Sequence, residues 1–180
     1  YIVNIETPKI IIVFLLMLFF TACLKPVSYP DEPNIEYVGF EELSDSGKIT
    51  FSFTDGDGDI GLDQDMVNGD FAPGSFYHYN LYINYFEMMN GQWVRGTADP
   101  NGNNFLDSLQ LDDTIFYPYR LENITPTGQN KALNGTIEIT LEPRYFNPFS
   151  NHNDSIMYKI LLIDRSFNHS NLLSTPLIVR

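Results

Sequence analysis

Strict alternation of apolar and polar residues marks the segment 48–54, and it constrains the fold more than any other feature. Ile49, Phe51 and Phe53 occupy every second position, and polar residues fill the positions between them. Successive side chains of a strand point to opposite faces, so this pattern predicts a half-buried β-strand. The segment 136–141 repeats the pattern and predicts a second such strand.

Further runs rich in β-branched and aromatic residues are separated by Gly, Pro, Asn and Asp, and no stretch after Phe20 has helical periodicity. Asn90-Gly91 between two such runs predicts a tight hairpin. The pattern predicts an all-β domain over 35–180, a single antiparallel immunoglobulin-like β-sandwich of seven or eight strands, with a small barrel as the alternative. The other predicted strands are 35–40, 76–88, 92–95, 113–121, 155–163 and 172–179.

The start of the chain has the order of an export signal. Lys9 precedes an apolar run over 10–20, followed by Thr21, Ala22 and Cys23. At about 1.5 Å per residue this run is too short to cross a hydrocarbon layer of about 30 Å. The segment resembles a bacterial lipobox, which implies a signal peptide over 1–22 and lipidation at Cys23. An ordinary cleaved signal peptide and a buried hydrophobic helix are the alternatives. The proline-rich segment 23–34 is predicted to be a tether.

Composition excludes several classes of protein. Ten Lys and Arg residues against 23 Asp and Glu residues give a net charge of -13, which argues against a nucleic-acid-binding protein. A single cysteine excludes an internal disulfide framework. Hydrophobic residues make up 43% of the chain, enough to build a core.

A dense acidic loop follows the first predicted strand. Asp55, Asp57 and Asp59 alternate with glycines, and oxygen ligands at this spacing suit Ca²⁺. The glycines also match G-x-G-x-x-G, but the aspartates would repel a pyrophosphate and no helix follows. An EF-hand is excluded because its Gly and Glu positions hold other residues. Asp164, with Asp63 as a weaker candidate, is predicted to complete a structural calcium site; the alternative is a solvated turn without an ion.

The phrase FSFTDGDGDIG over 51–61, with Asp164-Arg165, Ser170-Asn171 and the lipobox, resembles a family of uncharacterised lipoproteins from Bacteroidetes. This resemblance implies a lipid-anchored all-β domain of the bacterial envelope and supplies no catalytic residue. The segment 160–179 resembles the last two strands of bacterial immunoglobulin-like domains.

Recognisable catalytic motifs are absent from the sequence: it has neither a zinc-type His-Glu-x-x-His nor a G-x-S-x-G elbow. We therefore expect a non-enzymatic binding or structural module, held at the outer membrane by its lipid, on the periplasmic face or the cell surface. Its expected partner is an envelope protein or a glycan. The alternative is a glycan hydrolase or carbohydrate-binding module that uses carboxylates and aromatic residues assembled by the fold. Aromatic residues of the predicted hairpin, among them Tyr77, Tyr82 and Trp93, could form such a platform.

Overall fold

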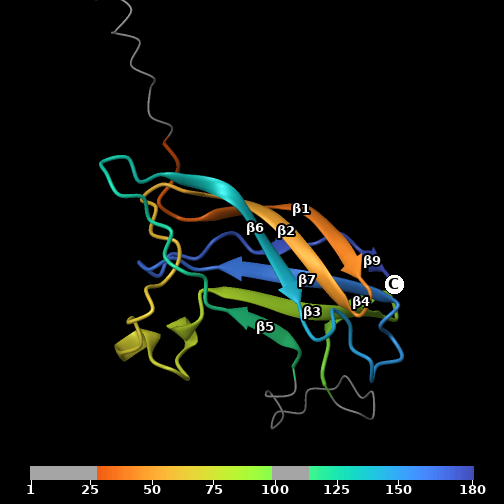
Figure 1. Ribbon diagram of the computed structural model, residues 1–180. Helices are drawn as coiled ribbons and strands as arrows, with labels where there is room; N and C mark the ends of the chain where they lie inside the picture. Colours follow the sequence, from red (N-terminus) through yellow and green to blue (C-terminus); the bar gives the residue numbers. More distant parts are fainter. Residues whose placement is uncertain (1–27, 99–113) are drawn as a thin grey trace, which may run out of the picture.

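The computed structural model describes residues 28–98 and 114–180, and these form an antiparallel β-sandwich (Figure 1). Two short 3-10 turns, η1 (Gly69–Phe71) and η2 (Phe76–His78), are the helical elements of this part of the chain. The strands are β1 (Asn34–Leu43), β2 (Ser46–Asp55), β3 (Leu81–Met89), β4 (Gln92–Arg95), β5 (Phe116–Tyr119), β6 (Leu133–Leu141), β7 (Ser155–Leu162), β8 (Leu173–Ser174) and β9 (Ile178–Val179).

The strands divide between two sheets that face each other. The first sheet has the order β1-β2-β6. The second has the order β4-β3-β7-β8, with β5 also paired to β3 and β9 to β7. Every named strand pair is antiparallel. The sheets do not close on each other, so the sandwich is confirmed and the barrel alternative is wrong.

The core lies between the two sheets and follows the predicted alternation. In β2 every second residue is buried, from Gly47 through Phe53 to Asp55. In β3 the same alternation buries Leu81, Ile83 and Tyr85 completely. Burial of alternate apolar side chains from both sheets is the main source of stability in such a sandwich.

The predicted hairpin is present, but several predicted strands are shorter than expected. The segment 172–179 forms two short strands, β8 and β9, where one was predicted, so the described residues form nine strands and not seven or eight. Asn90 and Gly91 join β3 to β4, and both have positive φ (51° and 79°), as a tight primed turn requires. The aromatic run predicted as a strand from residue 76 instead begins with the turn η2, and β3 starts only at Leu81. Its local hydrogen bonds, such as the one from the His78 amide to the Ser75 carbonyl, replace strand pairing there.

Among the described residues, no helix is long and apolar enough to cross a membrane. Cys23 and the predicted signal peptide lie outside these residues. The sandwich begins at Asn34, next to the predicted boundary at residue 35.

Candidate metal centre

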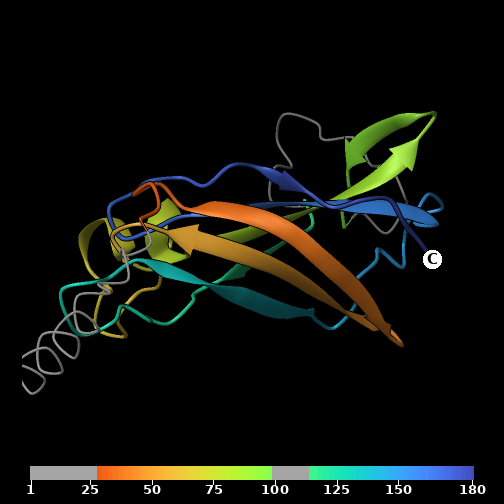
Figure 2. The same ribbon diagram turned by 90° about the horizontal axis from the view of Figure 1, so that it is seen from above.

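Two strands from different sheets deliver carboxylates to the same end of the sandwich. Asp55 is the last residue of β2 and continues its inward alternation after Phe53. Asp164 comes two residues after Leu162, the buried last residue of β7, and is itself buried. Both strands run toward the end of the molecule that carries η1 and η2 (Figures 1 and 2). Strand periodicity points the Asp55 side chain into the gap between the sheets, and Asp164 is buried just beyond the end of β7.

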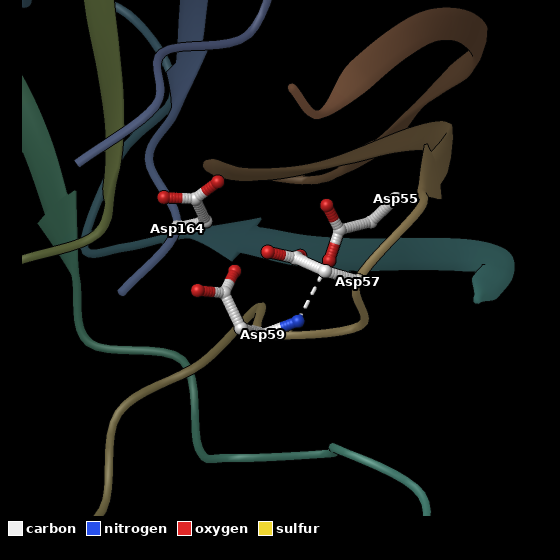
Figure 3. Close-up of side chains that lie close together, drawn as sticks. All are labelled: Asp55, Asp57, Asp59 and Asp164. Atoms are coloured by element: carbon white, nitrogen blue, oxygen red, sulfur yellow. Dashed lines mark hydrogen bonds between the residues drawn. The ribbon is translucent and has the colours of Figure 1, made fainter. Parts of the chain in front are cut away.

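The chain turns sharply after β2, and glycine makes this turn possible. Gly58 has a φ of +69°, and a Cβ atom there would lie 1.8 Å from the Lys131 carbonyl oxygen. Only glycine fits such a conformation and such a close approach. The turn brings Asp57 and Asp59 back beside Asp55 (Figure 3).

The four aspartates converge on one point, and we call Asp55, Asp57, Asp59 and Asp164 the aspartate cluster (Figure 3). One carboxylate oxygen from each residue lies within 4.8 Å of those from the other three. Two ligands on opposite sides of a Ca²⁺ ion lie about 4.6–5.2 Å apart, given bond lengths of about 2.3–2.6 Å. For Mg²⁺ the same separation is about 4.2 Å. The spacing of the oxygens in the aspartate cluster is of the order of the separation between opposite ligands of a hard divalent cation.

Three oxygen atoms of the cluster are buried without a hydrogen-bond partner. They are the Oδ1 atoms of Asp55, Asp57 and Asp59. The Asp55 side chain is completely buried, and only its Oδ2 atom is used, accepting a hydrogen bond from the Asp59 amide at 2.9 Å. A buried polar atom without a hydrogen-bond partner lowers the free energy of unfolding by about 1–3 kcal/mol, and a charged group lowers it further. These three atoms belong to residues whose carboxylate oxygens lie close together, so repulsion between them adds to this cost.

The segment after β7 holds Asp164 in position. Asn168 donates twice to its carboxylate, from the backbone amide at 2.7 Å and from Nδ2 at 2.9 Å. Phe167 has a positive φ of 67°, which lets the chain fold back between Asp164 and Asn168. Ser166 Oγ donates to Asp59 Oδ2 at 2.7 Å and so links the two segments.

Burial, together with repulsion between the carboxylates, raises the affinity of the cluster for protons. Burial raises the pKa of Asp55 to about 7, and the neighbouring charges of Asp57 and Asp59 add to this effect. Burial, followed by the charge of Asp59, also raises the pKa of Asp57. The pKa of Asp164 is raised by burial, although its hydrogen bonds from Asn168 oppose the shift. A divalent cation would supply the positive charge that these protons otherwise provide.

Basic side chains of the described residues do not neutralise the cluster. The ion pairs in this part of the protein involve other acidic residues. Arg165 is adjacent in sequence, but its Nη1 atom donates to the Gly61 carbonyl at 3.0 Å and its Nη2 atom donates to Thr125 Oγ1. Four carboxylates therefore face one another without a side-chain cation.

The structure separates the five aspartates that the sequence suggested as ligands into two groups. The four members of the aspartate cluster lie together, and the weaker candidate Asp63 does not join them. Asp63 is exposed, and its Oδ1 atom accepts a hydrogen bond from Asn123 Nδ2 at 2.8 Å, outside the cluster. Sequence reasoning missed the supporting roles of Ser166 and Asn168. Their positions, two and four residues after Asp164, were the available signal.

Comparison with family models, curated proteins and solved structures gave no match. The resemblance to Bacteroidetes lipoproteins therefore stays a prediction, and the geometry of the site carries the functional argument.

Proposed function

We propose that this protein is a non-enzymatic, lipid-anchored module of the bacterial envelope whose aspartate cluster binds one structural Ca²⁺ ion. The lipid anchor at Cys23 and the immunoglobulin-like relationship rest on the sequence patterns. The calcium site rests on geometry: four carboxylates lie within 4.8 Å of one another, and a completely buried member has an unpaired oxygen. The bound ion would join the end of β2 to the end of β7 and so lock the two sheets together.

The buried oxygen Asp55 Oδ1 carries the proposal. A solvated acidic turn would leave its carboxylates in water, where close pairs of charges cost below about 1 kcal/mol each. Here Asp55 is completely buried, Asp164 is 2% exposed, and Asp57 and Asp59 are half-buried, so water relieves the repulsion only in part. A site of this kind holds either protons or a cation, and at neutral pH a hard divalent ion with oxygen ligands fits best.

The same burial argues against a glycan hydrolase centred on the cluster. A glycosidase acid must touch the glycosidic oxygen, and its partner carboxylate lies about 5–9.5 Å away. Asp55 has a raised pKa, as a catalytic acid would, but its side chain is completely buried. Its carboxylate is therefore placed to hold an ion inside the fold and not to meet a polysaccharide.

Calcium titration by isothermal calorimetry tests the proposal. The wild-type protein should bind one Ca²⁺ ion, and Asp57→Asn should lower the affinity by at least about tenfold because it removes a charged ligand. Asp63→Asn is the matched control, since it removes a carboxylate from the same loop but from outside the cluster. Its affinity should equal that of the wild type. Absence of a binding heat in the wild type, or equal losses in both variants, would contradict the proposal.

A further inference from the structure

A shallow groove lies on the outer face of the second sheet, and none of its lining residues belongs to the aspartate cluster. It has a volume of about 270 Å³, close to the lower limit of small-ligand sites, which is about 300 Å³. We call it the β3 groove. Its lining residues are Phe76, Tyr82, Asn84, Arg95, Phe116 and Leu161.

Strand register assembles the floor of the β3 groove from four strands, and Phe76 of η2 adds a fifth segment. Tyr82 and Asn84 are on the half-exposed outer face of β3. Leu161 of β7 is directly opposite Tyr82, and Phe116 of β5 is directly opposite Asn84. Directly paired residues share a face of the sheet, so these side chains form one continuous surface. Arg95 reaches this surface from the neighbouring strand β4.

One wall of the groove is a pair of parallel aromatic rings. The rings of Phe76 and Tyr82 stack with centroids 5.0 Å apart and an angle of 6° between their planes. The Tyr82 hydroxyl donates to the Phe76 carbonyl, which fixes the turn against the strand. Phe76 and Phe116 nevertheless remain 52% and 42% exposed. Ring faces carry negative partial charge and attract polarised C–H groups, such as those on the flat side of a sugar ring.

The groove is positively charged on a strongly acidic protein. Arg95 uses one N–H group to bond Asn84 Oδ1 at 2.6 Å, and its Nε atom is buried without a partner. Lys159 is opposite Asn84 on the same face, with its Nζ atom 4.7 Å from the centre of the Phe86 ring. None of the groove-lining residues is acidic, and neither cation takes part in the ion pairs of the described residues. Guanidinium donors recognise a carboxylate in a planar, two-pronged geometry.

The sheet beneath the groove favours a sugar over an extended peptide. β3 is hydrogen-bonded to β5 on one side and to β7 on the other along the residues that form the groove floor. A peptide that binds as an added strand needs a free strand edge, and β3, at the centre of this floor, has none along these residues. A sugar needs only a ring face, planar hydrogen-bonding side chains and, for an acidic sugar, a cation.

We propose that the β3 groove binds a saccharide that bears a carboxylate, such as a uronic acid residue of a polysaccharide. The sugar ring stacks on the Phe76 and Tyr82 pair, and its carboxylate accepts hydrogen bonds from Arg95. Asn84 binds ring hydroxyls through its Nδ2 atom, because its Oδ1 atom is committed to Arg95. This site goes beyond the proposed calcium site and shares no residue with it.

Calorimetric titration with tetragalacturonate and with tetramannuronate tests this proposal. At least one of the two should bind, and Arg95→Gln should weaken that binding by at least tenfold. Tyr82→Ala should do the same through loss of the stacking surface, so the result does not depend on one variant. Phe149→Ala, which removes another exposed aromatic residue outside the groove, is the matched control and should bind as the wild type does.

Three outcomes would overturn the proposal. They are no binding of either acidic tetrasaccharide, equal binding of the neutral tetrasaccharide cellotetraose, and equal or tighter binding of tetraglutamate, which would indicate an acidic peptide site. Each titration is run with calcium and with chelator. Saccharide binding is expected under both conditions. Absence of a calcium-binding heat would therefore contradict only the calcium proposal, and absence of saccharide binding would contradict only the saccharide proposal.

Discussion

Two buried carboxylates at opposite ends of the sandwich differ in how the protein satisfies them. Glu87 and Asp55 both have completely buried side chains. Glu87 is near the end of β3 that pairs with Ile156, whereas Asp164 and the aspartate cluster follow the other end of β7. The protein thus has a completely buried carboxylate at each end, with the buried Asp164 beside Asp55 at one of them.

Hydroxyl donors satisfy Glu87, and other carboxylates surround Asp55. Tyr85 donates to Glu87 Oε1 at 2.9 Å, and Ser150 donates to Oε2 at 2.5 Å. Asp55 has one backbone donor and an unpaired Oδ1 atom. A buried carboxylate with a donor on each oxygen is a structural element of the core. A buried carboxylate whose neighbours are carboxylates is neutralised by a proton or by a bound cation, and this contrast is the basis of the calcium proposal.

The substitution Glu87→Ala should have the largest effect on stability. It leaves a cavity and removes the acceptor of two buried hydroxyl groups, which together cost about 3 kcal/mol. The loss in the free energy of unfolding, measured by urea denaturation, should be equal with calcium and with chelator. A loss that depended on calcium would mean that the two ends of the sandwich are coupled, and the comparison would fail.

The pH dependence of stability should separate the two carboxylates next. The pKa of Asp55 is about 7 in the folded protein, above its ordinary value of 3.8, so between about pH 4 and pH 7 the folded state holds a proton that the unfolded state has released. Without calcium, the free energy of unfolding should therefore fall by about 2 kcal/mol as the pH rises through this window.

Calcium should weaken this pH dependence, because the ion displaces the proton from the cluster. Asp55→Asn should remove most of it, whereas Asp63→Asn is the control that should keep it. Urea denaturation at pH 5 and pH 8 provides the measurement. A calcium-free wild-type protein that is more stable at pH 8 than at pH 5 would contradict the description of the cluster.

Local patterns were sufficient to predict which aspartates lie together. The alternation of β2 fixes the side on which Asp55 emerges, and the Asp-Gly repeat fixes the turn that follows. Asp164 was predictable because it directly follows an apolar run that forms β7. In each case, the information lies within a few residues of the site.

The β3 groove could not be predicted in this way. Its lining depends on which residue of β5 or β7 is opposite which residue of β3, and this register is set by packing of the whole sandwich. The turn at Phe76 was missed because an aromatic run resembles a strand even where local hydrogen bonds form a 3-10 turn. The sequence indicated aromatic residues near the hairpin, but it did not indicate Arg95 or Phe116 as their neighbours.

The most direct measurement of the central claim compares the thermal unfolding of the wild type and Asp57→Asn, each in excess calcium and in chelator. The account predicts a reversal of order. At a calcium concentration of about a hundredfold over the dissociation constant, the bound ion adds about 2.7 kcal/mol to the free energy of unfolding of the wild type. The wild type should then be more stable than Asp57→Asn. In chelator, Asp57→Asn should be at least as stable as the wild type, because one repulsive charge is gone. The same order and the same difference under both conditions would contradict a calcium ion in the aspartate cluster.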